Sequence, residues 1–170
     1  TASTFFFVNE GADTGDIVSQ VEVVISSNDS ARNLYDKLTL TARAQLIEVL
    51  DKVKNNSLKR VPQNTNEGSS WRKRKPIDGK IDWRMPDVGV YNLVRSLSEP
   101  YCGAHFEFLG ENIRIKNCKI VDVAGVEDRE PGYVIAGNSD KVRFIVKCGL
   151  GSVTIELEQP FNGINEGGYL

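Results

Sequence analysis

Residues 104–157 read AHFEFLGENIRIKNCKIVDVAGVEDREPGYVIAGNSDKVRFIVKCGLGSVTIEL, and this stretch decides the fold of the chain. Short β-branched and aromatic runs alternate in it with Gly, Asn and Asp turn residues. The pattern predicts five strands: Ala104–Leu109, Asn112–Val121, Gly132–Ala136, Lys141–Cys148 and Ser152–Leu157. Five short strands with such turns are typical of a small OB-like β-barrel. We therefore expect a barrel domain over residues 101–160 and a flexible, Gly-rich tail over residues 161–170.

The N-terminal part of the chain combines strand and helix patterns. Ser3–Val8 is rich in aromatic residues and predicts a buried strand, and Ile17–Ile25 alternates well enough to predict a second strand. Apolar residues then recur every three or four positions over Ala31–Lys54, which predicts one amphipathic helix. Two strands and one helix cannot bury all their apolar faces on each other. We therefore expect residues 1–70 to be the end of a larger α/β domain.

A polar loop separates these two parts. Residues 64–70 read NTNEGSS, a composition typical of a loop or linker. The following residues, 71–100, contain the turn sequence PIDG and a short apolar helix pattern at Val88–Ser96, and we interpret them as a connecting segment. The expected fold class is therefore α/β followed by β.

Composition excludes several classes of protein. The 170 residues include 21 basic and 23 acidic side chains, so the formal charge is −2, which does not suit a surface built to coat nucleic acid. The longest apolar runs, of about four residues, are far shorter than the roughly 20 of a membrane-spanning helix, and we expect no membrane partner. Cys102, Cys118 and Cys148 are widely spaced, and with a single histidine they form no recognisable zinc site. We expect reduced structural cysteines, no metal and a cytoplasmic location.

The sharpest local motif is GADTGDI at residues 11–17. Its two glycines permit positive φ or a close approach of ligand to backbone, and Asp13 places a carboxylate between them. A plain hairpin turn explains the same composition. Asp-Thr-Gly is also the aspartic-protease signature, but here it follows Asn9-Glu10-Gly11 instead of an apolar strand.

Taken with four later segments, this motif resembles the folate-dependent formyltransferases, a family that includes methionyl-tRNA formyltransferase and the nucleotide-sugar N-formyltransferases. The matching segments are, in order, FFFVNEGADTGDIVSQ (5–20), SARNLYDKL (30–38), RVPQ (60–63), RKRKPIDGKIDW (72–83) and VYNLVRSLSEPYCGAHFEFLGENIRI (90–115). The resemblance implies that residues 1–70 are the C-terminal part of a Rossmann-like formyltransferase domain. It also implies an OB-like domain after it and 10-formyltetrahydrofolate as the formyl donor.

The resemblance also implies the site. The family reacts through an asparagine, a histidine two residues later and an aspartate, and Asp13 matches the aspartate. Its carboxylate would raise the pKa of the histidine and fix its tautomer, while the asparagine would stabilise a developing oxyanion. The resemblance places Asn9, Glu10, Gly11, Ala12 and Asp13 on the loop that lines the folate pocket. For Asn9 and Glu10, a solvated strand end is an equally good interpretation.

The sequence departs from the family in one respect. The Asn-x-His triplet should lie a few tens of residues before Asp13, and only twelve residues precede it here. We therefore expect this C-terminal portion to be inactive alone. The single histidine, His105, falls inside the predicted barrel, and we expect it to be structural.

Three functions stay open from the sequence. The segment SEPYCGAHFEFLG and the compact barrel favour an N-formyltransferase that acts on the amine of a nucleotide-linked sugar. The second is methionyl-tRNA formyltransferase, for which the basic run Arg72–Lys75 would neutralise phosphates, although a solvated linker explains that run as well. The third is a non-catalytic binding module derived from the family. A homodimer is compatible with all three.

Overall fold

The computed structural model describes residues 1–170, apart from the side chain of Thr65. It separates into two compact units, Thr1–Lys73 (unit 1) and Arg74–Leu170 (unit 2). Unit 1 holds β1 (Ala2–Phe6), β2 (Ile17–Glu22), α1 (Ala31–Lys54) and a short 3₁₀ helix, η1 (Thr65–Glu67). Unit 2 holds the 3₁₀ helix η2 (Pro76–Gly79), α2 (Asp87–Ser96), β3 (Ala104–Phe108), β4 (Glu111–Val121), β5 (Val134–Gly137), β6 (Arg143–Lys147) and β7 (Ser152–Leu157).

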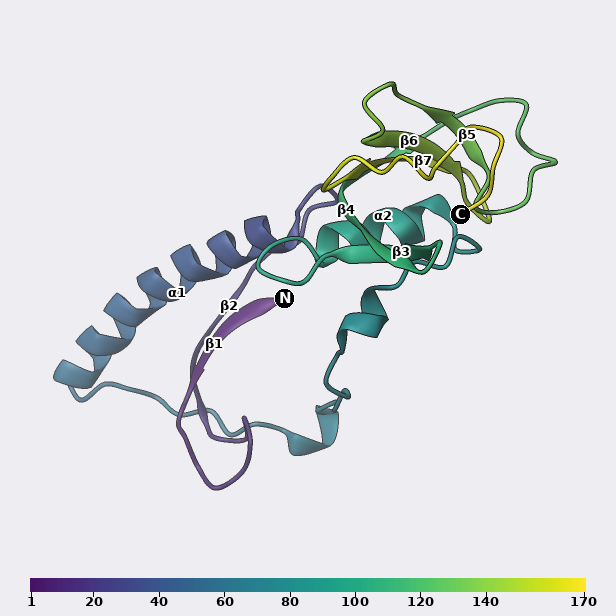
Figure 1. The fold of residues 1–170 in the computed structure, drawn as a ribbon. Coiled ribbons are helices and arrows are strands. Elements are labelled where there is room, and N and C mark those ends of the chain that lie inside the picture. The colour runs from purple at the N-terminus through teal and green to yellow at the C-terminus, as the bar shows by residue number, and fades with distance from the viewer. The chain divides into compact units, whose positions relative to one another are not determined.

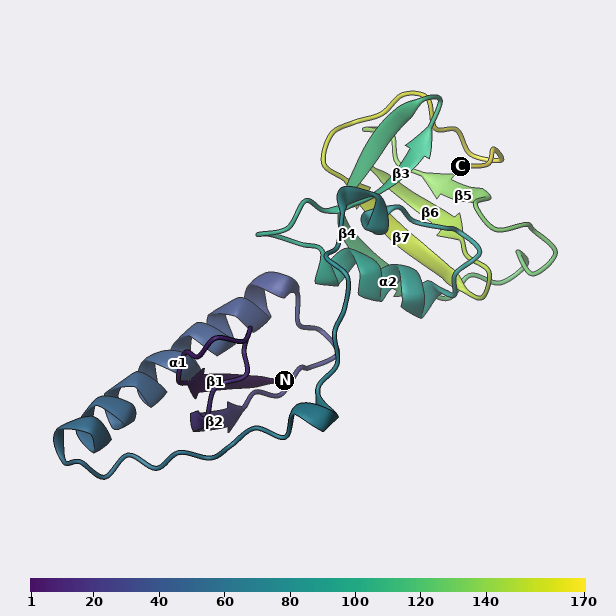
Figure 2. The same ribbon diagram turned by 90° about the horizontal axis from the view of Figure 1, so that it is seen from below.

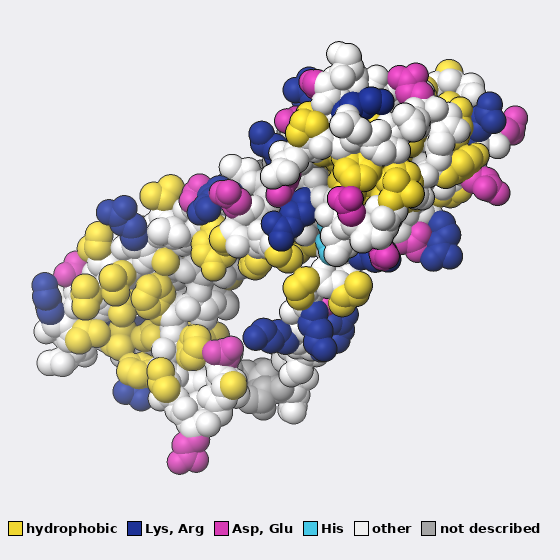
Figure 3. Space-filling view, in the orientation of Figure 1, with side chains coloured by type: hydrophobic (Ala, Val, Ile, Leu, Met, Phe, Trp, Pro, Cys, Tyr) yellow, Lys and Arg dark blue, Asp and Glu magenta, His cyan; other side chains and the backbone are white. Residues whose placement is uncertain are grey.

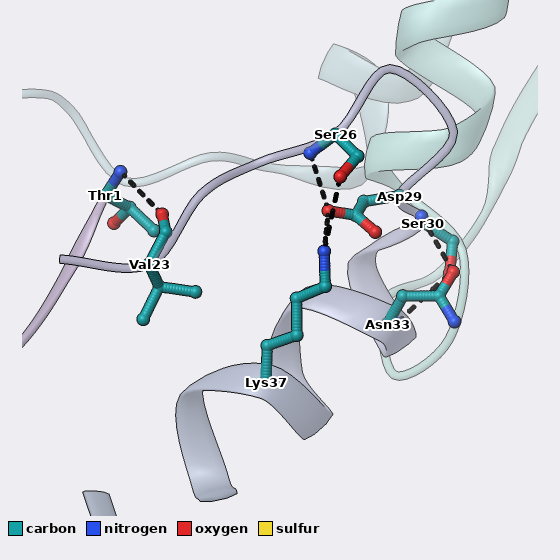
Figure 4. Close-up of polar contacts among 7 residues, drawn as sticks. All are labelled: Thr1, Val23, Ser26, Asp29, Ser30, Asn33 and Lys37. Atoms are coloured by element: carbon teal, nitrogen blue, oxygen red, sulfur yellow. Dashed lines mark hydrogen bonds and ion pairs between the residues drawn. The ribbon is translucent and has the colours of Figure 1, made fainter. Parts of the chain in front are cut away.

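Helix α1 occupies the range that the sequence predicts, because side chains cap its first turn (Figure 4). The Ser30 hydroxyl accepts a hydrogen bond from the Asn33 N–H at 3.2 Å, and the Asn33 side chain accepts one from the Ser30 N–H at 3.1 Å. This reciprocal capping box satisfies two donors that the first turn otherwise leaves unpaired. Lys37 also forms an ion pair with Asp29 at 2.6 Å, which ties the helix to the preceding turn.

Strands β1 and β2 form an antiparallel pair against which α1 packs (Figure 1). Gln45, only 2% exposed, joins the helix to both strands. Its side-chain N–H₂ donates to the Ser3 carbonyl at 3.2 Å and to the Ser19 hydroxyl at 3.0 Å. The first strand is half-buried, whereas the sequence predicts a buried one, because the single helix covers only one face of the pair.

Unit 1 leaves large apolar side chains exposed. Val24, Leu40 and Ile47 are 78%, 66% and 64% exposed, and Figure 3 shows hydrophobic side chains gathered on the visible face of this unit. A Rossmann-like fold requires a mostly parallel sheet with helices on both faces. Within the described residues of unit 1 the only sheet is the antiparallel pair, so the expected Rossmann-like part is not confirmed.

Unit 2 is built on a five-stranded sheet in the order β3-β4-β7-β6-β5, with antiparallel neighbours (Figure 2). Helix α2 packs against β4 and β7. Phe106, Phe144 and Ile155 are fully buried between the sheet and its coverings. Trp83 meets Phe106 edge-on, with 5.5 Å between ring centroids. This core confirms the strands predicted for residues 104–157.

The sheet does not close into the expected OB-like barrel over residues 101–160, because other segments occupy both of its edges. On the β3 edge, the Ile81 N–H donates to the His105 carbonyl at 2.7 Å. On the β5 edge, the Val134 N–H donates to the Gly168 carbonyl and the Gly167 N–H to the Val134 carbonyl, both at 2.9 Å. Backbone groups paired in this way are not available for a β3-to-β5 ladder, and none is present among the described residues.

Two segments that the sequence analysis places outside the barrel contribute to the core of unit 2. The expected connection, residues 71–100, supplies the buried side chains of Ile81 and Val90. The expected flexible tail, residues 161–170, supplies Ile164, which is fully buried. Apolar side chains of both segments pack into the core of unit 2. Neither segment therefore serves only as a linker or a frayed end.

The cysteines give a stability prediction for unit 2. Burial and the neighbouring Cys148 raise the pKa of the Cys118 thiol from 9.0 to about 12, and burial raises the pKa of the Cys148 thiol to about 12. The unfolded chain therefore loses these protons at lower pH than the folded one, so we expect stability to fall as pH rises from about 9 towards 12.

Denaturant unfolding at several alkaline pH values measures this effect. With Ellman's reagent at neutral pH, we also expect the exposed Cys102 thiol to react quickly and the two buried thiols only after unfolding. Equal reaction rates for all three thiols in the folded protein would contradict the buried assignment.

Candidate functional site

The residues that the sequence singles out lie on one exposed loop, Asn9–Asp16, between β1 and β2. The Asn9 side-chain oxygen accepts hydrogen bonds from the Gly11 N–H at 3.1 Å and from the Thr14 hydroxyl at 2.8 Å. These bonds fold the loop over itself. Asn9 therefore has a structural task in the loop, beyond the contact with ligand that the resemblance implies.

Asp13 stands at the tip of this loop in a left-handed conformation, with φ of 55°. Aspartate tolerates this region better than most residues, but the conformation still needs support from its surroundings. The carboxylate makes no hydrogen bond or ion pair within the part of the chain that the structure describes. It is exposed and accessible to a ligand.

Gly15 lies at the base of the loop, where its backbone is in close contact with Phe7. It is buried, and a Cβ atom there would lie 1.6 Å from the Phe7 carbonyl oxygen. The Phe7 N–H donates to the Asp16 carbonyl at 3.0 Å across the same constriction. Only glycine permits this close approach of the two backbone segments.

A segment distant in sequence, Lys59–Gln63, supports the loop. Val61 and Ile17 exchange two backbone hydrogen bonds of 2.8 and 2.9 Å. The Arg60 guanidinium lies 3.8 Å from the centre of the Phe7 ring. The Gln63 side-chain N–H₂ donates to the Asp13 carbonyl at 3.0 Å and to the Gly15 carbonyl at 2.6 Å. Gln63 ends the matching segment RVPQ, but sequence reasoning assigned it no role, since an amide that binds a loop about 50 positions away leaves no local pattern of its own.

The loop carries three carboxylates, on Glu10, Asp13 and Asp16, and two free backbone donors. The N–H groups of Glu10 and Ala12 have no hydrogen-bond partner among the described residues, and both residues are exposed. Free backbone donors beside a carboxylate suit a flat, polar, nitrogen-rich ring such as that of a reduced folate. The residues present therefore fit the group that the resemblance implies.

The single histidine, His105, lies in unit 2 and not on the loop. His105 lies in β3 of unit 2, paired with Arg114 of β4, and its carbonyl accepts the hydrogen bond from Ile81. It is half-buried within the sheet. These contacts account for His105 as a structural residue of unit 2.

Unit 2 also has a groove of about 540 Å³ beside Trp83 and Phe106. Its charged groups neutralise one another: Lys80 pairs with Glu107 at 2.6 Å, and Arg84 forms a short ion pair with Asp82. Hydrogen bonds from Arg84 lower the pKa of Asp82 to about 2. Both cationic side chains that line the groove are therefore already paired.

The side chains of the basic run Arg72–Lys75 are exposed, as is Trp71, which is 80% exposed. No group of three or more potential metal ligands gathers anywhere in the part of the chain that is described. Nor, among those residues, is any helix long and apolar enough to span a lipid bilayer.

Comparison with known families adds the evolutionary context. Residues 73–164 match the family described as "Formyl transferase, C-terminal domain". The match covers more than half of the chain and most of unit 2. It begins at the basic run and ends at the buried Ile164 of the C-terminal segment.

Three solved structures are similar over most of the chain. The N-formyltransferase from Helicobacter canadensis, in complex with folinic acid and dTDP-3-aminofucose, is 20% identical and covers 92% of this chain and 55% of its own, with a TM-score of 0.67. HypX from Aquifex aeolicus, in complex with tetrahydrofolic acid, is 21% identical and covers 89% of this chain and 26% of its own, with a TM-score of 0.68.

Methionyl-tRNA formyltransferase from Clostridium thermocellum is 20% identical and covers 71% of this chain and 51% of its own, with a TM-score of 0.61. At this level of identity the three structures establish a shared fold. The chain spans between about a quarter and just over half of the length of these proteins.

Proposed function

Because the chain belongs to the formyl transferase family through its C-terminal domain, we propose that it is the C-terminal portion of a folate-dependent N-formyltransferase. In this proposal the enzyme transfers a formyl group from 10-formyltetrahydrofolate to the amine of a nucleotide-linked amino sugar. The observation that carries the proposal is the Asn9–Asp16 loop, which presents the Asp13 carboxylate beside unpaired backbone donors.

Each part of the loop has a role in this proposal. Asn9, Glu10, Gly11 and Ala12 hold the folate, chiefly through the backbone, and 10-formyltetrahydrofolate supplies the formyl carbon when bound. Asp13 accepts a hydrogen bond from a catalytic histidine, stabilises its charged form and so favours removal of a proton from the attacking amine. The 170 residues hold no histidine besides His105, so we propose that the catalytic histidine lies in a segment N-terminal to the loop.

The architecture follows the same proposal. Unit 1 would be the end of a Rossmann-like domain, whose remaining strands cover the exposed apolar face of unit 1. Unit 2 would be an OB-like domain opened by the two segments at its edges. We further propose a cytoplasmic location, since the cysteines are unpaired thiols. We also propose a reaction without a metal, since no group of three potential metal ligands gathers among the described residues.

Three observations support a sugar acceptor over tRNA. The Helicobacter canadensis enzyme, whose complex contains dTDP-3-aminofucose, is among the similar structures. The formal charge of −2 and the single basic run are also a weak basis for binding a long polyanion.

An acceptor assay tests the proposal. The protein expressed from its complete reading frame is incubated with 10-formyltetrahydrofolate and either dTDP-linked amino sugars or methionyl-tRNA. We expect formylation of a sugar amine that changes little with salt. Formylation of the tRNA, with a steep salt dependence, would establish the alternative acceptor. No transfer to either acceptor, from a folded protein that still binds folinic acid, would support a binding module derived from the family.

A further inference from the structure

We propose that Gln63 is a positioning residue for formyl transfer, because its side-chain amide holds the loop in the conformation that presents Asp13. The catalytic part of this inference rests on the proposed function. The structural part concerns only the loop and stands without it.

The evidence is a pair of hydrogen bonds from one nitrogen. The Gln63 Nε2 donates to the Asp13 carbonyl at 3.0 Å and to the Gly15 carbonyl at 2.6 Å, so both of its N–H groups are used. The two carbonyls flank Thr14 and therefore fix the peptide groups on both sides of the turn. The left-handed φ of 55° at Asp13 is a conformation that persists only when surrounding contacts hold it.

Gln63 is itself held in place. The preceding Pro62 restricts its own φ and keeps the segment extended. The paired backbone bonds between Val61 and Ile17, at 2.8 and 2.9 Å, fix this segment beside the start of β2. The Arg60 guanidinium adds a contact with the Phe7 ring at 3.8 Å. The amide donor is thus carried on a segment anchored to both ends of the loop.

Two substitutions separate hydrogen bonding from simple filling of space. Gln63→Met keeps the length of the side chain but removes both donors. Gln63→Glu keeps the shape but places a carboxylate against two carbonyl oxygens, which repel it. A matched control is Gln20→Met, because the Gln20 amide donates to the Thr4 hydroxyl at 2.9 Å on an exposed part of the same strand pair.

In the protein expressed from its complete reading frame, we expect Gln63→Met to lower the kcat of formyl transfer by roughly 10–100-fold. Small misplacements of a catalytic group have effects of this size. The KM of the acceptor should stay within about twofold, because no acceptor contact is assigned to Gln63, and Gln63→Glu should lower kcat at least as much. Gln20→Met should match the native enzyme. A kcat for Gln63→Met equal to that of the control would overturn the inference.

Amide hydrogen exchange provides a readout that does not depend on activity. We expect the Gly11 and Phe7 amides, whose hydrogen bonds close the loop, to exchange at least about tenfold faster in Gln63→Met than in Gln20→Met, with the exchange of α1 unchanged. Unchanged loop exchange would refute the positioning role even if the enzyme transfers formyl groups. Faster loop exchange in a protein without formyl transfer would leave the structural part intact and refute only the proposed function.

Discussion

Substituting asparagine for Asp13 should lower the kcat of the proposed formyltransferase by roughly 10²–10⁴-fold. The substitution preserves the size of the side chain but removes the negative charge that, in the proposed function, favours the protonated form of a catalytic histidine. Because asparagine tolerates left-handed φ as well as aspartate does, the loop should keep its conformation. The KM for the acceptor should change little, since the lost interaction strengthens as the reaction proceeds.

The matched control for this experiment is Asp16→Asn. Asp16 lies on the same loop, and its known contact is through its backbone carbonyl, which accepts the hydrogen bond from Phe7 at 3.0 Å. Steady-state kinetics with a saturating formyl donor compares the two variants. If both substitutions lower kcat equally and only slightly, Asp13 does not have the catalytic role proposed for it.

Gly15→Ala is expected to disrupt the loop outright. The new Cβ would lie 1.6 Å from the Phe7 carbonyl oxygen, and a backbone oxygen cannot move aside as a flexible side chain can. The ends of β1 and β2 would have to separate, at a cost of about 3 kcal/mol or more, in the upper range for single substitutions. We expect folate binding and formyl transfer to be lost together.

Gly110→Ala provides the comparison. Gly110 has a positive φ of 80° but nothing within 4 Å of the position of a new Cβ. Its substitution therefore measures the conformational cost of alanine without a clash, which we expect to be about 1 kcal/mol. Thermal unfolding and titration with folinic acid distinguish the variants. Normal folate binding by the Gly15→Ala protein would show that the constriction is not required.

Local patterns in the sequence predicted most elements of the fold. The spacing of apolar residues predicted α1 with its observed limits, Ala31–Lys54. Turn residues separated the five strands of unit 2. The barrel prediction failed because closure depends on which segments occupy the sheet edges, and the partners of His105 and Val134 come from parts of the chain that were interpreted as a connection and a tail.

The candidate site also depends on contacts that local sequence patterns do not predict. Glycines around an aspartate predicted a special loop, and the resemblance supplied its chemistry. The left-handed Asp13, the constriction at Gly15 and the two bonds from Gln63 depend on tertiary contacts. A glutamine in a polar stretch after a proline has many interpretations, and only the folded chain selects one of them.

The central claim is that Asn9–Asp13 is a folate-binding and catalytic loop. Its most direct test is a titration of the isotopically labelled native protein with folinic acid, followed by NMR of the backbone amides. We expect the amide signals of Asn9–Asp13 to shift on binding, while those of Gly137 and Glu166 in unit 2 stay in place. Saturable binding that leaves the loop signals unmoved would contradict it.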